Sequence, residues 1–268
     1  MSASALEEAT EHQLRARSAI SAALRDGPAH AYLITGPTGS GKAASARAFA
    51  AEMLAEGSPD ADGTRRRALL DPSPHPDLVW LRPVGMSHAV DDVRSRVIRP
   101  APLKPFEGRR RVFVVEAADA LNEESQNAML KTLEEPPPHA HLILIASDAE
   151  AVLATVASRC QRIEFAPLPE EAVVARLGTG IPVETAVAAA RLSRGDLGRA
   201  RLLAGEGGAG IRAAVEKTMT GVLEDRLSDS PWLAILESAT RAGDEAAQRA
   251  EAALEQEAED GTKRTKKE

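Results

Sequence analysis

Apolar residues along the chain fall into five short extended runs, separated by longer stretches with helical spacing. The runs are Tyr32–Thr35, Leu78–Leu81, Val112–Val115, Leu142–Ala146 and Arg162–Phe165. Between them apolar residues recur every three or four positions, as at Val90, Val93 and Val97, which is the spacing of one helix face. Because strands that alternate with helices pair in parallel and are covered on both faces, the pattern predicts a three-layer α/β domain.

The pattern changes after Pro167-Leu168-Pro169, a break that ends the strand and helix alternation. Three short helices are predicted next, at Glu170–Leu177, Val183–Leu192 and Leu197–Ala204. Residues 205–210 are rich in glycine and are expected to form a flexible joint. Residues 211–268 are predicted to be helical, with Val215, Met219 and Val222 on one face, and to end in a disordered basic tail at 263–268. The expected domains are therefore 1–168, 169–204 and 205–268.

Composition indicates an intracellular globular protein. The chain has 268 residues, of which 43% are hydrophobic, and no apolar signal stretch or membrane-spanning segment. Its net charge of −7 and its 3% of aromatic residues argue against an independent single-strand DNA binder, which uses a basic groove and stacking platforms. We therefore expect a cytoplasmic protein that contacts DNA only as part of an assembly.

A phosphate-binding loop is the first candidate site. Gly36, Gly39, Gly41 and Lys42 stand in the spacing of a P-loop, between a predicted strand and a predicted helix. The next residue is Ala43, where a P-loop uses a Ser or Thr hydroxyl to hold Mg²⁺. A chance match in a Gly-rich turn is the alternative, but the order of strand, loop and helix argues against it. The sequence thus predicts a nucleotide site with a defect.

A second defect is predicted after the strand Val112–Val115. ATPases place two acidic residues there, one for the metal and one to polarise water. Here the pair is Glu116 and Ala117; Glu116 could still reach a metal, whereas Ala117 cannot orient water. A well-placed general base contributes roughly 10²–10⁴ in rate, so hydrolysis is expected to be very slow or absent. The simpler interpretation is that Glu116 and Asp119 solvate the strand end and begin the next helix, and for Asp119 this interpretation is favoured.

Further motifs are specific enough to indicate a family. They are NAMLKTLEEPPP at 127–138, LILIASD at 142–148 and SRCQRIEF at 158–165. With the P-loop and VVEAADAL, in this order, they resemble the AAA+ subunits of the bacterial sliding-clamp loader, and most of all those of the delta-prime type, whose nucleotide site is defective. The resemblance is strong over about residues 12–168 and weakens beyond.

The resemblance implies a role for the Ser158-Arg159-Cys160 motif. In the family this arginine projects onto the ATP held by a neighbouring subunit, so Arg159 is expected to be an arginine finger that acts in trans, with Ser158 and Cys160 as the rest of an interface motif. The alternative is a surface arginine paired with a local acid. Cys160 is the only cysteine, which excludes an internal disulfide, and a packed thiol is expected there.

The resemblance also sets expectations for cofactors. Many members carry a four-cysteine zinc module after the P-loop helix, but residues 57–67 contain no Cys, so no metal site is expected there. No cofactor is expected to be required, although Lys42 and the loop glycines leave weak binding of ATP or ADP open. Either Ala146 or Ser147 occupies the region where the family uses a polar residue to sense nucleotide, so this sensor is ambiguous from the sequence.

The function expected from the resemblance is that of a non-hydrolysing stator in the clamp loader of DNA polymerase III. Such a subunit belongs to the polymerase holoenzyme, a nucleotidyltransferase, without an ATPase activity of its own. Expected partners are the gamma/tau and delta subunits, the sliding clamp and, through the complex, primed DNA at the nucleoid-associated replisome. A collar-like helical end, which looks short here, would join the ring. The alternatives are an active gamma/tau-type ATPase and an isolated nucleotide-binding regulator.

Overall fold

Five parallel strands form one sheet, in the order β2-β3-β4-β1-β5. Their bounds are Ala31–Thr35 for β1, Leu78–Leu81 for β2, Arg111–Val115 for β3, Ala140–Ala146 for β4 and Gln161–Glu164 for β5. All five predicted runs are confirmed as strands, with ends that differ from the prediction by at most two residues. The computed structural model describes residues 4–83, 85, 87–224, 232–241, 243–244 and 248.

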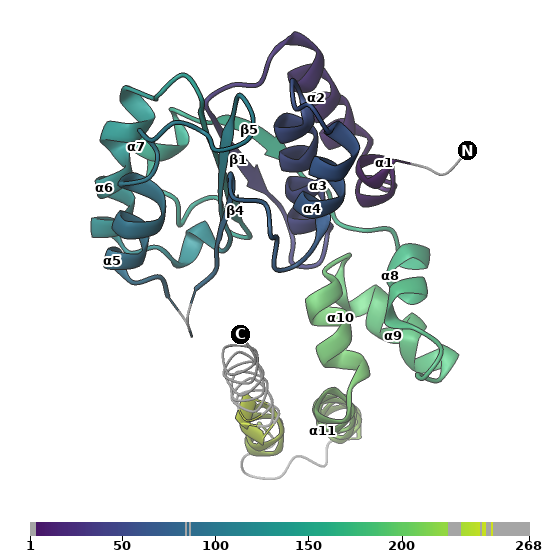
Figure 1. Ribbon diagram of the computed structural model, residues 1–268. Helices are drawn as coiled ribbons and strands as arrows, with labels where there is room; N and C mark the ends of the chain where they lie inside the picture. The colour runs from purple at the N-terminus through teal and green to yellow at the C-terminus, as the bar shows by residue number, and fades with distance from the viewer. Residues whose placement is uncertain are drawn as a thin grey trace, which may run out of the picture. The chain divides into compact units, whose positions relative to one another are not determined.

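Helices cover both faces of this sheet, as predicted (Figure 1). On one face lie α1 (Ala5–Ala9), α2 (Leu14–Asp26), α3 (Lys42–Ala55) and α4 (Ala61–Leu69). On the other lie α5 (Val90–Val93), which continues as the π-helical turn η1 (Arg94–Ile98), α6 (Glu123–Glu134) and α7 (Ala154–Ala157). A short 3₁₀ turn, η2 (Ala118–Ala120), follows β3. The arrangement is the three-layer α/β domain that the sequence pattern indicates.

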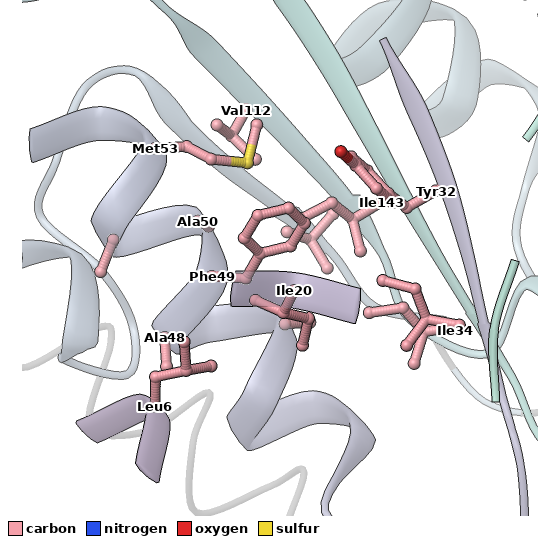
Figure 2. Close-up of a cluster of buried hydrophobic side chains, with 14 of the residues drawn as sticks. Leu6, Ile20, Tyr32, Ile34, Ala48, Phe49, Ala50, Met53, Val112 and Ile143 are labelled. Atoms are coloured by element: carbon pink, nitrogen blue, oxygen red, sulfur yellow. The ribbon is translucent and has the colours of Figure 1, made fainter. Parts of the chain in front are cut away.

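Alternation along the strands builds the two cores. Tyr32 and Ile34 of β1 join the core beneath α3, whereas Leu33 between them joins the core beneath α6. Phe49 of α3 is fully buried and meets Tyr32 edge to face, with ring centroids 4.9 Å apart (Figure 2). The strands β1, β3 and β4 are buried at every position, which explains why they are almost continuous apolar runs, whereas the edge strand β5 buries only Ile163.

Internal contacts divide the chain into residues 1–172 and residues 173–268. The division falls within α8 (Glu170–Leu177), which is followed by α9 (Val183–Ser193), α10 (Leu197–Ala204) and α11 (Glu206–Leu223). The three helices predicted after residue 169 are thus confirmed. The limits of the three expected domains stay a prediction.

The predicted flexible joint at 205–210 is wrong, because α11 begins at Glu206. One of the glycines there, Gly208, permits close packing. A Cβ atom on Gly208 would lie 2.1 Å from the carbonyl oxygen of Leu202 in α10. Glycine at this position lets the start of α11 approach the end of α10, and this contact outweighs its low helix propensity.

Beyond α11, residues 233–241 are helical. Met219, Val222 and Trp232 are exposed. The basic tail predicted at 263–268 lies outside the described residues. Among the residues that the structure does describe, none of the helices combines the length and apolar character that crossing a bilayer requires.

Candidate functional site

Three loops meet at one edge of the sheet because β1, β3 and β4 are parallel and adjacent in it. The phosphate-type loop follows β1, Glu116 and Ala117 follow β3, and Ser147 follows β4. Residues from all three line one cavity of about 280 Å³. The carboxyl edge of a parallel sheet is where such folds bind ligands, so this cavity is the candidate nucleotide site.

The loop glycines adopt backbone conformations that other residues rarely take. Gly41 precedes α3 with φ of 102°, in the left-handed region. Gly36 has φ of 141°, and a Cβ atom there would lie 2.3 Å from the carbonyl oxygen of Phe165. Gly39 is also left-handed. These glycines are therefore required by the path of the loop itself.

Lys42 is folded back onto this loop. Its Nζ atom donates to the carbonyl oxygens of Gly36, at 2.6 Å, and Pro37, at 2.8 Å. A third contact, at 3.4 Å, joins it to the hydroxyl of Ser147. The ammonium group thus contacts loop carbonyls within the cavity where a P-loop lysine meets phosphates.

Ser147, and not Ala146, is the polar residue that faces the loop. Its hydroxyl lies 3.4 Å from Lys42 Nζ and from Thr38 Oγ1, whereas Ala146 is buried in the core beneath α6. The ambiguity left by the sequence is resolved by the last turn out of the sheet, which points position 146 inward and position 147 outward.

The first residue of α3 after the lysine, Ala43, lines the cavity and offers no oxygen to a metal ion. The N-terminal segment packs close to the same turn. Ser45 Oγ donates to the carbonyl of Ala9, at 3.1 Å, and the side chain of Gln13 donates to the carbonyls of Ser40 and Ala166, at 3.2 and 2.8 Å. The start of α3 is therefore held by the chain's own N-terminal helices.

Glu116 is bound by two donors from β2 and the residue after it. Its Oε2 atom accepts from Trp80 Nε1, at 2.7 Å, and from Arg82 Nε, at 3.0 Å. Arg82 also binds Asp71 and thereby holds the pKa of that carboxyl below its ordinary value, and Arg47 stacks on the Trp80 ring, 4.1 Å from its centroid. The carboxylate expected to reach a metal is thus part of a structural network at the edge of the sheet.

Ala117 follows in a left-handed conformation, with φ of 52°, and lines the cavity with a methyl group. Asp119, two residues later, lies in the short turn η2 that follows the strand, as the favoured interpretation of this residue expected. Its Oδ2 atom accepts from the backbone N–H groups of Ser147, at 2.9 Å, and Asp148, at 3.0 Å. Asp119 therefore fixes the loop that places Ser147 against Lys42.

Arg159 lies on the same domain, in the turn between α7 and β5. Its Nη2 atom donates to Glu134 Oε1 at 2.6 Å, and its Nη1 atom donates to the carbonyl of Thr155 at 2.8 Å. The side chain remains 35% exposed, so its guanidinium can still be reached from outside. Arg159 is thus paired with a local acid, Glu134, as the alternative interpretation of a surface arginine expects, and its side chain also lies at the surface.

The neighbours of Arg159 in the motif have local roles. The Ser158 hydroxyl donates to the carbonyl of Thr155, at 3.2 Å, and closes the last turn of α7. Cys160 packs against the core beneath α6, and burial raises the pKa of its thiol to about 11. A neutral thiol of this kind is a packing group at neutral pH.

The stretch without cysteines, residues 57–67, forms the turn after α3 and most of α4. Asp60 caps α4 by accepting from the Gly63 N–H, and Arg65 binds Glu52 of α3. Throughout the described ranges, His, Cys, Asp and Glu side chains form no group of three or more that could hold a metal ion.

Comparison with known proteins gives the family. A family profile described as "DNA polymerase III, delta subunit" matches residues 13–169, more than half of the chain. DNA polymerase III subunit delta′ of Pseudomonas aeruginosa is 35% identical over 216 residues, which cover 76% of this chain and 64% of the relative. Subunit delta′ of Escherichia coli is 33% identical over 181 residues, covering 65% and 54%.

A gamma-class relative is also similar. DNA polymerase III subunit tau of Bacillus subtilis is 29% identical over 158 residues, covering 58% of this chain and 28% of the relative. The chain spans less than two thirds of the length of each of these relatives. The parallel sheet, the P-loop that follows its strand β1 and the match across them make the first domain an AAA+ domain, and the chain belongs to the delta-prime family of DNA polymerase III clamp-loader subunits.

Proposed function

We propose that this chain is a stator of the DNA polymerase III clamp loader, a subunit that does not hydrolyse ATP but presents Arg159 to ATP bound by a neighbouring subunit. Its role would be to complete that neighbour's active site and to help place the sliding clamp on primed DNA. The observation that carries the proposal is the combination of a nucleotide site without its catalytic groups and an accessible arginine on the same rigid domain.

The nucleotide site supports the negative half of the proposal. Position 43 supplies no metal-binding hydroxyl, and position 117 supplies no general base. The remaining acid, Glu116, accepts two hydrogen bonds from Trp80 and Arg82. Binding a metal there would require breaking or sharing these charge-assisted bonds. Weak binding of ATP or ADP through the loop and Lys42 remains part of the proposal, without turnover.

The position of Arg159 supports the positive half. An arginine finger stabilises the charge that develops on the transferred phosphoryl group and contributes about 10³–10⁵ in rate. Arg159 follows α7, a helix whose Val156 and Ala157 are buried, so its backbone is fixed while its side chain reaches the surface. An arginine finger needs a fixed backbone as well as an exposed side chain, because ordering a mobile loop on binding would reduce the free energy gained from the contact with ATP.

The partners follow from the family and are part of the proposal. The neighbour that binds ATP would be a gamma/tau subunit, and the delta subunit, the clamp and primed DNA would be reached within the complex. The protein would act in the cytoplasm at the replisome. We propose no required cofactor and no zinc site.

The alternative, an active gamma/tau-type ATPase, has one observation in its favour, the similarity to subunit tau of Bacillus subtilis. Water would then have to replace both the hydroxyl missing at Ala43 and the base missing at Ala117. Two vacant catalytic positions make this the weaker candidate.

Steady-state ATP turnover tests the proposal. The chain is assayed alone, and then within a clamp loader reconstituted with gamma/tau and delta subunits, clamp and primed DNA. We expect no turnover above the blank from the isolated chain. In the assembly, Arg159→Ala should abolish the contribution of one ATP site, since removal of a finger lowers its rate by about 10³-fold or more.

Arg162→Ala is the matched control, because it removes the same charge three residues away on the exposed edge of β5. It should leave turnover unchanged, and both variants should still assemble by size-exclusion chromatography. ATP hydrolysis by the isolated chain that Lys42→Ala abolishes would overturn the proposal and establish the alternative.

A further inference from the structure

The only acid that binds the guanidinium of Arg159 among the described residues is Glu134. It lies 25 positions earlier in the chain, at the end of α6. The Nη2 to Oε1 distance is 2.6 Å, within the range of a charge-assisted hydrogen bond. A second bond, from Nη1 to the carbonyl of Thr155, holds the other terminal nitrogen.

The backbone of Glu134 is itself well fixed. α6 begins at an Asn122 cap, which accepts from the Ser125 N–H at 2.8 Å, and its Met129 and Leu133 are buried in the core. Three prolines, 136–138, follow shortly after the helix and prevent its continuation. Glu134 is therefore a carboxylate on a rigid element, next to a buried residue.

The same helix also holds the other end of α7. Gln126, two turns before Glu134, accepts from the Leu153 N–H at 2.7 Å and donates to the Ala151 carbonyl at 3.1 Å. One face of α6 thus fixes the start of α7 through Gln126 and the arginine beyond its end through Glu134.

The pair leaves Arg159 competent to bind phosphate. A guanidinium carries five N–H donors, and the two bonds described use two of them. The other three donors, Nε–H included, have no hydrogen-bond acceptor among the described residues, so an anion can bind while Glu134 stays in place. Glu134 and Arg159 are 50% and 35% exposed, which keeps both within reach of a neighbouring subunit.

From these contacts we infer that Glu134 is the positioning residue for Arg159: it holds the guanidinium in the conformation in which the finger meets the neighbour's ATP. The inference rests on the proposed function of Arg159. Glu134 touches no substrate and acts through the arginine alone.

The expected effect follows from the entropy of a long side chain. Ordering such a side chain on binding typically changes an equilibrium by a factor of about 2 to 13. Without Glu134 this ordering has to occur when the neighbour's ATP reaches the transition state. We therefore expect Glu134→Ala to lower the kcat of the neighbouring site roughly 3- to 10-fold, with KM for ATP unchanged.

The experiment is a double-mutant cycle in the reconstituted clamp loader, with kcat and KM measured separately. Glu134→Gln keeps an oxygen that can accept from Nη2 and should remain within about 2-fold of wild type. Glu135→Ala removes a neighbouring carboxylate that forms no ion pair among the described residues, and it should have no effect. On the Arg159→Ala background, Glu134→Ala should add nothing.

Each other outcome has a defined meaning. If Arg159→Ala lowers turnover but Glu134→Ala leaves it unchanged or raises it, the positioning role is wrong and the proposed finger stands. Equal effects of Glu134→Ala with and without Arg159 would also overturn the positioning role, because the acid would then act elsewhere. If Arg159→Ala itself has no effect, the proposed function fails, and the role of Glu134 fails with it.

Discussion

Glu116 and Asp119 illustrate, at the scale of single residues, how the partners of an acid decide its role. Both acids follow β3, where an ATPase keeps its metal ligand and base. Glu116 accepts from Trp80 and Arg82, and Asp119 accepts from the backbone of the loop after β4. Both carboxylates therefore stabilise the edge of the sheet through hydrogen bonds, while the position of the catalytic base is occupied by Ala117.

Cys160 gives a prediction at the same scale. Because burial raises its thiol pKa to about 11, the native chain should react with iodoacetamide at pH 8 roughly 10- to 100-fold more slowly than an ordinary exposed thiol. Urea should remove the difference. The labelling rate of the native chain, measured against pH, should keep rising beyond pH 9; a plateau near pH 8.5 would contradict the raised pKa.

The same shift has a consequence for stability. The folded chain binds the thiol proton more tightly than the unfolded chain does, since the folded pKa is the higher one. The contribution of the neutral thiol to the free energy of unfolding is therefore fully present below about pH 8.5 and is lost as the pH rises towards 11.

Contacts between elements can reverse what local propensity suggests, as the junction of α10 and α11 shows. Its glycines were expected to form a flexible joint, yet Gly205 is the N-cap of α11 and the glycines after it lie inside the helix. The two glycines whose surroundings differ most are Gly208, which faces the backbone of α10, and Gly210, which has open space where a Cβ atom would lie. Glycine is thus required for packing at position 208, whereas nothing in the structure requires it at position 210.

Gly208→Ala should destabilise the second unit by about 1–3 kcal/mol, because its Cβ atom would clash with the Leu202 carbonyl. Gly210→Ala should stabilise α11 by about 0.5–1 kcal/mol through helix propensity alone. Thermal unfolding followed by far-UV circular dichroism measures both. Stabilisation by Gly208→Ala as well as by Gly210→Ala would mean that the close approach of α10 and α11 is absent in solution.

At the scale of the whole molecule, stability of the first unit depends on two apolar layers that share one sheet. Phe49 fills the centre of one layer between α3 and β1, with 0% exposure. Phe49→Ala should lower the free energy of unfolding by about 3–5 kcal/mol, from lost burial and a residual cavity. Native domains have only about 5–15 kcal/mol in total, so the variant should be marginally folded at 37 °C.

Leu14→Ala is the control for this prediction, because Leu14 is 72% exposed at the start of α2. Its effect should stay within about 0.5 kcal/mol. Urea denaturation of both variants provides the measurement. A loss below about 1 kcal/mol for Phe49→Ala would mean that the layer can repack around the deletion.

The sequence by itself determined the elements and the motifs. The apolar pattern placed all five strands to within two residues. Strands buried on both faces, such as β1 and β4, are almost continuous apolar runs, whereas the edge strand β5 buries only Ile163. The P-loop and the SRC motif could also be recognised from the sequence, since each is a short contiguous motif defined by the identity and spacing of its residues. The glycine joint was predicted wrongly because the close approach that favours glycine at position 208 is made to another element, α10.

Only the tertiary structure decided which side chains meet. Glu116 binds donors 34 and 36 positions away, Asp119 fixes a loop 28 positions away, and Arg159 binds an acid 25 positions away. Periodicity states which face of an element is buried, but it does not state which polar groups the parallel register brings to one edge. The choice of Ser147 over Ala146 and the pairing of Arg159 with Glu134 therefore depend on the packed sheet and its helices.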